Sequence, residues 1–341
     1  MTHTRSPLQE RLTNIMRRFP QGRVAVIGDL IADQFLYGEI SRVSREAPVL
    51  ILRHERTETM PGGAANCAMN LAALGAQTRL VGVAGEDGAG RAMLSKLRAA
   101  GVDCGGVVTT TALRTTTKIR VLAGQAHSTR QQVIRVDFES DEPLDASVRE
   151  RLNVHLRDAA NDADAIIISD YNYGVADADT AGALRDLAAR RGAPVIVDSR
   201  FRLAQFPGFT SATPNEAEVE QLLGRRLPDA AALEAAGAEL LGRLSYNSLL
   251  ITRGGKGMML FETGVPKPLH IAAVGSSEPV DVTGAGDTVI ATFALALGSG
   301  ASAADAAHLA NHAGGLVVMK RGTASVNRQE LLASVLHGNA A

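Results

Sequence analysis

Residues 281–297 read DVTGAGDTVIATFALAL, and they join a glycine-rich turn to an apolar run with no helix-breaking residue. A helix starting in this run leaves its first backbone N–H groups unpaired, at Gly284, Ala285 and Gly286. Those N–H groups and the positive end of the helix dipole favour negative charge. The stretch therefore predicts an anion-binding site at the start of a buried helix.

Asp287 lies at the same junction, and two interpretations of it are open. An Asp at the start of a helix is most often structural, because it accepts backbone N–H groups there. Beside a bound phosphoryl group, the same carboxylate could take the proton of an attacking hydroxyl. The flanking glycines and the nearby Asp281 favour the second interpretation.

The composition is that of an ordinary globular protein with a sizeable core: 341 residues, 45% hydrophobic and 21% charged. The formal net charge of −1 provides no general positive field for nucleic acid or an anionic membrane. Cys67 and Cys104 lack metal-ligand spacing and are expected to be inert buried thiols in a reducing compartment. No apolar run reaches the ~20 residues that span a bilayer, so a cytoplasmic location is expected.

Strand-like and helix-like segments alternate along most of the chain, which predicts a mostly parallel sheet covered by helices on both faces. The apolar run 23–28 ends at Asp29, with Asp33 four residues later, and other runs end at Asp170 and at residues 252–257. Ligands bind at the carboxyl ends of parallel strands, so Asp29 and Asp33 could accept polyol hydroxyls. Turn and cap aspartates are the open alternative.

Two stretches, about 34–57 and 107–138, differ from this pattern and predict a small, partly solvated antiparallel lid. Alternation along strands places Lys118 with Arg120 on one face, and Arg135 with Asp137 on one face. Arg42 and Arg45 add further cations. Solvated surface charges remain the ordinary explanation for all of them.

Three further patterns allow both a structural and a binding interpretation. Gly62, Gly63 and Asn66 begin a helix of small residues, where the backbone could approach a ligand closely. Residues 213–218 (TPNEAE) carry helix-start signals, and Asn215 with Glu218 could alternatively hold the waters of Mg²⁺. Asn311 lies on a face of small side chains that suits either a planar nucleobase or core packing.

The stretches PGGAANCAMNLAALGA and DVTGAGDTVIATFALAL resemble the two signatures of the ribokinase-like (phosphofructokinase B type) carbohydrate kinases, and TPNEAE resembles their Asn-x-x-Glu magnesium motif. More narrowly, GDLIADQFLYGEISRVSREAPV, TTKIRVLAGQ, QQVIRVDFE and ISDYNYG resemble the kinases of D-glycero-β-D-manno-heptose 7-phosphate, which lead to ADP-heptose for lipopolysaccharide inner core. Many such kinases are fused to an adenylyltransferase with a His-x-Gly-His motif. That motif is absent here, so a separate adenylyltransferase is expected downstream.

The resemblance implies a single ribokinase-like domain, 1–341: a three-layer α/β/α sandwich with a β lid, often paired with a second copy in a homodimer. It implies ATP and Mg²⁺, with Asp287 as base and residues 284–286 as anion hole. It also implies sugar binding by Asp29, Asp33, Gly62, Gly63, Asn66 and Asp170, metal binding by Asn215 and Glu218, and ATP binding along Thr252, Arg253, Gly254, Gly255, Gly257 and Asn311.

A sugar 7-phosphate brings a dianion that aspartates would repel, so we expect Arg42, Arg45, Lys118, Arg120 or Arg135 to neutralise it. Within the resemblance, Tyr173 and Ser199-Arg200 stand where related kinases carry Lys and Pro-Lys. A kinase for another sugar or a nucleoside is the main alternative, and a non-catalytic sugar- or nucleotide-binding regulator is another. A nicotinamide-dependent dehydrogenase is poorly supported, because the first strand leads to Gly28-Asp29-Leu30 and not to G-x-G-x-x-G.

Overall fold

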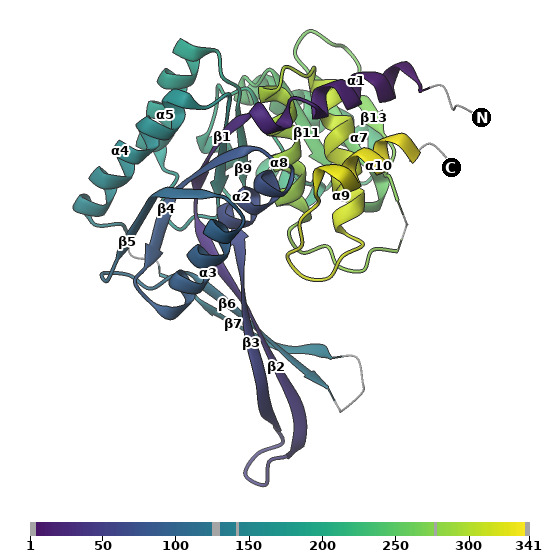
Figure 1. Ribbon diagram of the computed structural model, residues 1–341. Coiled ribbons are helices and arrows are strands. Elements are labelled where there is room, and N and C mark those ends of the chain that lie inside the picture. Colours follow the sequence, from purple (N-terminus) through teal and green to yellow (C-terminus); the bar gives the residue numbers. More distant parts are fainter. Residues whose placement is uncertain (1–4, 125–129, 141–142, 276–277, 338–341) are drawn as a thin grey trace.

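The computed structural model describes residues 5–124, 130–140, 143–275 and 278–337. Its centre is a nine-stranded sheet with the order β13-β12-β11-β10-β9-β8-β1-β4-β5, in which only β12 runs against the other strands (Figure 1). The strands are β1 (Arg23–Gly28), β4 (Gln77–Gly85), β5 (Asp103–Thr110), β8 (Ala165–Asp170), β9 (Val195–Ser199), β10 (Ser211–Ala212), β11 (Ser248–Thr252), β12 (Met258–Glu262) and β13 (Leu269–Ile271).

Helices cover both faces of this sheet, because its central strands are apolar on both sides. In β1, Val24 and Val26 belong to one buried core, while Ala25 and Ile27 belong to the other. The first core is covered by α1 (Pro7–Met16), α2 (Ala64–Ala73), α3 (Gly88–Ala99), α8 (Ala285–Gly298), α9 (Ala303–Val317) and α10 (Arg328–His337). The second is covered by α4 (Ala146–Asp162), α5 (Ala178–Arg191), α6 (Glu216–Leu223) and α7 (Ala230–Leu244). Single 3₁₀ turns occupy Phe19–Gln21, Leu203–Gln205 and Gly254–Lys256. The predicted three-layer α/β fold is thus confirmed.

A separate four-stranded sheet forms the lid, with the order β3-β2-β6-β7. Its strands are β2 (Leu30–Val43), β3 (Leu50–Gly63), β6 (Thr117–Gly124) and β7 (Gln131–Phe138). The long hairpin β2–β3 projects away from the body, as Figure 1 shows. Its base is buried at Leu30–Asp33, whereas its tip is exposed.

The lid differs from its expected outline in two respects. Its second segment starts at Thr117 and not near 107, because residues 103–110 pair in parallel with β4 as the edge of the main sheet. Its strands are not all antiparallel, since β2 and β6 run parallel. Both strands leave the body in the same direction, which requires that pairing. Across the described residues, no helix combines the length and hydropathy needed to cross a bilayer.

Candidate active site

The turn before α8 presents the backbone as the sequence predicts. Gly284 precedes the helix with φ 76°, a left-handed conformation suited to glycine. Asp281 holds the turn by accepting the N–H groups of Thr283 at 2.9 Å and Gly322 at 2.8 Å. These bonds hold the turn at the start of α8, where the Ala285 N–H donates to the Val282 carbonyl oxygen at 3.2 Å and would have to exchange that partner for an anion.

Asp287 lies in the first turn of α8 and is almost fully buried. One carboxylate oxygen accepts Asn66 Nδ2 at 2.7 Å, and the other accepts the Tyr171 hydroxyl at 3.2 Å. Burial raises the pKa of Asp287 to about 7, although both hydrogen bonds oppose that rise. A carboxyl group with such a pKa can exchange a proton near neutral pH.

A cleft opens on one side of this carboxylate, between the end of β11 and the helices α8 and α9. Its lining is Thr252, Gly254, Gly255, Gly257, Met258, Ala273, Val274, Pro279, Val282, Ala285, Gly286, Val289, Asn311, Gly314, Gly315 and Val318. The structure thus gathers seven of the residues predicted for nucleotide and anion binding around one largely apolar cleft. Gly284 lies at its edge as the N-cap of α8, whereas the Arg253 side chain pairs with Glu216 at 2.8 Å.

Asn215 and Glu218 form the reciprocal capping box that starts α6, with both backbone-to-side-chain bonds at 2.9 Å. The structural interpretation of TPNEAE is therefore realised. Burial also raises the pKa of Glu218, opposed by its hydrogen bonds with Asn215 and by Arg200, and burial together with the Glu218 charge raises the pKa of Asp198. The described residues contain no group of three or more His, Cys, Asp or Glu side chains placed to hold a metal directly.

The base of the lid lies on the other side of Asp287. Asp33 is buried there, pairs with the Arg120 guanidinium, and adds negative potential at Asp287. A Cβ on Gly62 would approach Asp33 Oδ2 to 2.5 Å, and Gly63 has a positive φ of 57°. Both glycines are thus required where β3 enters α2, directly before Asn66.

The predicted lid cations divide into two groups. Lys118, Arg120 and Arg135 share one face, and each has an acidic partner: Glu139 at 3.6 Å, Asp33, and Asp137 at 2.9 Å, respectively. This face therefore carries three cations and three carboxylates. Arg42 and Arg45 are exposed near the tip of the β2–β3 hairpin, so the structure does not bring them to Asp287 (Figure 1).

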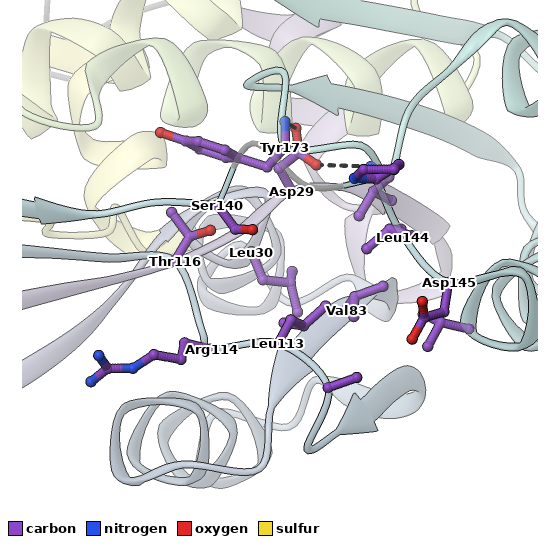
Figure 2. Close-up of a pocket in the computed structure, with 14 residues that line it drawn as sticks. Asp29, Leu30, Val83, Leu113, Arg114, Thr116, Ser140, Leu144, Asp145 and Tyr173 are labelled. Carbon is purple, nitrogen blue, oxygen red and sulfur yellow. Dashed lines mark hydrogen bonds between the residues drawn. The ribbon is translucent and has the colours of Figure 1, made fainter.

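Asp29 and Asp170, both predicted to bind sugar, hold loops in this structure. Asp29 accepts the backbone N–H groups of Tyr171, Tyr173 and Val175 at 2.7–3.1 Å. Asp170 pairs with Arg202 and accepts the Ser199 hydroxyl at 2.6 Å. Figure 2 shows Asp29 on the wall of a second, smaller pocket at the lid base, where the Arg114 guanidinium points away from the other labelled residues.

Sequence reasoning missed Tyr171 and Arg202. Tyr171 follows β8 directly, so its place at the carboxyl edge of the sheet could have been predicted from the strand that ends at Asp170. Its contact with Asp287, 116 residues away, could not. Arg202 lies three residues beyond the predicted Ser199, within a 3₁₀ connection that has no periodic signal.

A strand-turn-helix junction with a buried carboxylate, an anion-binding turn and an adjoining cleft defines a group-transfer site on a ribokinase-like fold. Solved structures share that fold: Arabidopsis thaliana ribokinase complexed with ribose and ATP (TM-score 0.70, 22% identity, 92% of this chain, 98% of that chain) and Escherichia coli phosphofructokinase-2 with substrates and products (0.74, 18%, 93%, 99%).

Residues 21–330 match the family described as pfkB family carbohydrate kinase. The bifunctional protein HldE of Pseudomonas aeruginosa is 42% identical over 94% of this chain, and that of Caulobacter vibrioides is 41% identical over 96%. The chain spans 65% and 66% of their respective lengths. The chain belongs to the pfkB family of carbohydrate kinases, which are phosphotransferases, as the resemblance in its motifs implies.

Proposed function

We propose that this protein transfers the γ-phosphoryl group of ATP to the anomeric C1 hydroxyl of D-glycero-β-D-manno-heptose 7-phosphate, yielding the 1,7-bisphosphate and ADP. The whole chain, 1–341, would act as one kinase domain. The observation that carries the proposal is the position of Asp287, between an apolar cleft suited to a nucleotide and a charged lid suited to a sugar phosphate. The similarity to the HldE proteins selects the heptose among possible acceptors.

In this reaction the hydroxyl oxygen forms a bond to the γ-phosphorus while the bond to the β,γ-bridging oxygen breaks. Asp287 would take the hydroxyl proton, and the N–H groups at residues 284–286 would stabilise charge on the transferred group. Phosphoryl transfer depends mainly on such positioning and charge stabilisation. The buried environment of Asp287 also limits access of water as a competing acceptor.

Mg²⁺ would be held by Asn215 and Glu218. Their oxygen atoms are hard ligands, and a hydrated Mg²⁺ needs few protein carboxylates besides nucleotide phosphates. In this structure the same two side chains accept backbone N–H groups in the capping box, so the ion would be held through their remaining oxygen lone pairs or through its own waters. The ion, when bound with ATP, would neutralise phosphate charge.

The sugar 7-phosphate would bind the lid face of Lys118, Arg120 and Arg135. These cations already have carboxylate partners, so the phosphate has to displace or share those partners. Such exchange favours an acceptor that carries its own dianion over a neutral sugar, because a neutral sugar cannot replace a carboxylate. Asn66, Gly62 and Gly63 would line the route from this face to Asp287.

The lid also supports the proposal of a homodimer. β7 is an edge strand, and Val133, Ile134, Val136 and Phe138 are large exposed apolar residues along it. An exposed apolar edge strand is a site for pairing with another chain. Ile134→Glu should shift the sedimentation of a dimer to that of a monomer; a wild-type monomer would exclude this assembly. We further propose a cytoplasmic location, where an adenylyltransferase activity would use the product.

The test is ATP consumption with Mg²⁺ on four acceptors: the heptose 7-phosphate, fructose 6-phosphate, ribose and adenosine. Turnover on the heptose phosphate, abolished in Asp287→Asn, would support the proposal. Turnover only on an unphosphorylated acceptor would retain the kinase and refute the role of the lid face. Absence of turnover on all four, with intact ATP binding, would refute the proposed substrate and favour a binding protein.

A further inference from the structure

A buried chain of hydrogen bonds connects α2 with α8 and ends on the Asp287 carboxylate. The Thr288 hydroxyl donates to Asn70 Oδ1 at 2.9 Å and also lies 3.2 Å from the Gly284 carbonyl oxygen, its longer alternative acceptor. Asn70 Nδ2 donates to the Asn66 side-chain oxygen at 3.3 Å and to the Asn66 backbone oxygen at 2.9 Å. Asn66 Nδ2 then donates to Asp287 Oδ2 at 2.7 Å. All four residues are buried.

This chain has a direction, because a carboxylate only accepts hydrogen bonds. Asp287 requires the NH₂ group of Asn66, so the Asn66 oxygen must face Asn70. Asn70 must then offer its own NH₂ group to Asn66, which leaves its oxygen to accept from Thr288. A reversed Asn66 amide would place two acceptors in contact beside Asp287.

The two asparagines are one helical turn apart on α2, whereas Thr288 directly follows Asp287 on α8. The chain thus runs from the helix of the carboxylate through α2 and back to that carboxylate. A Cβ on Gly284 would approach Asn66 Nδ2 to 2.5 Å, so the glycine turn also leaves room for this amide. No sequence motif singled out Asn70.

We propose that Asn70 is a positioning residue for phosphoryl transfer, acting through Asn66 to keep an N–H donor on Asp287 and to fix the direction of its carboxylate. This inference rests on the proposed role of Asp287 as base. Asn70 itself is fully buried, so its side chain is not exposed to either substrate site. It would act on the rate of transfer and not on the affinity for either substrate.

Other groups facing Asp287 remain in place when Asn70 changes. They are Tyr171 after β8, Asp33 on β2, Cys67 on α2 and Asp198 on β9. Loss of the Asn66 donor would destabilise the charged form of Asp287 and raise its pKa further. The acidic limb of the pH–rate profile would then move to higher pH.

The experiment compares Asn70→Leu, which has similar volume and no charge, with wild type. We expect kcat to fall about tenfold, both KM values to stay within about twofold, and the acidic limb of kcat/KM to rise by about half a pH unit. Thr288→Val should give a smaller change in the same direction. Thr292→Val is the matched control, because Thr292 is a buried threonine of the same helix that donates only to the Thr288 backbone oxygen, at 2.8 Å.

A second readout does not depend on turnover. Aspartate labelled with ¹³C at the carboxyl carbon gives an Asp287 resonance that is assigned by its loss in Asp287→Asn, and its titration is followed by NMR in each variant. An upward shift of its midpoint in Asn70→Leu and Thr288→Val supports the inference. Unchanged titration and kcat in Asn70→Leu would overturn it, as would equal effects of Thr288→Val and Thr292→Val. If Asn70→Leu does not fold, the threonine pair decides. Inactivity of wild type on all four acceptors would instead refute the proposed function, while the titration still tests the hydrogen-bond chain.

Discussion

Two regions of the molecule, the α2–α8 junction and the lid sheet, stabilise charged side chains in different ways. At the junction, Asp287 is buried, has no cationic partner among the described residues, and is held by two neutral donors, Asn66 and Tyr171. On the lid, acidic and basic side chains occur in pairs, some of them half-exposed, such as Arg135–Asp137 and Arg53–Glu39, and others largely buried, such as Arg120–Asp33. A buried, unpaired charge is costly and sensitive to its surroundings, whereas an exposed ion pair contributes little.

This difference assigns different kinetic roles to the two regions. At the junction, burial disfavours the ionised form of Asp287. The resulting higher proton affinity is useful when this carboxylate must accept a proton. An exposed lid pair such as Arg135–Asp137 can exchange its partner at small cost, which suits binding and release of an anion, whereas the largely buried Arg120–Asp33 pair needs a replacement anion for its cation. We therefore expect changes at the junction to lower kcat, and changes on the lid to raise KM.

The largest effect is expected for Asp287→Asn, which keeps the size of the side chain and removes its basicity. Asn66 and Tyr171 can both still hydrogen-bond the new amide, so the fold should be retained. kcat should fall on the order of 10²–10⁴ with nucleotide affinity largely kept, measured by steady-state kinetics and calorimetry. Near-normal turnover would remove Asp287 as the base.

A smaller loss is expected for Gly284→Ala. The positive φ of Gly284 costs an L-residue about 1–2 kcal/mol. The added Cβ would lie 2.5 Å from Asn66 Nδ2, so the Asn66 amide would have to move. We expect kcat to fall about 10–100-fold with a modest loss of stability. Gly182→Ala in α5, where a Cβ meets nothing within 4 Å, is the control and should leave kcat unchanged. Equal kcat for both variants would contradict the role of the turn.

The same buried carboxylate predicts a pH-dependent stability. Burial raises the pKa of Asp287 to about 7 in the folded protein from its ordinary value of 3.8, so the folded state binds more protons between these two pH values. The loss of folding stability caused by ionising the buried Asp287 is absent below pH 4, grows as the pH rises to 7, and is fully present above pH 7. Asp287→Asn should therefore raise the free energy of unfolding by about 1–3 kcal/mol at pH 8 and by little at pH 4.5, measured by urea denaturation. A pH-independent difference would refute the raised pKa.

The features that could be predicted from sequence are those fixed by neighbouring residues. The glycine turn before α8, the capping box of Asn215 and Glu218, and the strand ends around the cleft all depend on local rules. The three-layer architecture followed from the alternation of strands and helices. Because parallel strands end at one edge, residues far apart in sequence could be placed together without knowing their contacts.

The hydrogen-bond and ion-pair partners of the site residues could not be predicted, because they depend on contacts between distant elements. The Asp29 carboxylate accepts three N–H groups of a loop more than 140 residues away, and Tyr171 reaches Asp287 across the sheet edge. Arg42 lies near the tip of the hairpin because β2 continues to Val43 and β3 begins only at Leu50, and this hairpin length could not be predicted. The lid cations were expected to be available to phosphate, and their acidic partners come from β2, β7 and Glu139.

The smallest effect is expected on the lid, for Arg120→Ala. Its guanidinium would contribute to binding the sugar phosphate but not to the chemical step, so KM for the sugar phosphate should rise about three- to tenfold while KM for ATP and kcat change little. Arg53→Ala is the matched control, because Arg53 also pairs with a lid carboxylate but is 74% exposed. It should change neither KM. Equal increases in both KM values for Arg120→Ala would show that Asp33, left buried without its cation, disturbs the junction itself, and the division between the two regions would then fail at this residue.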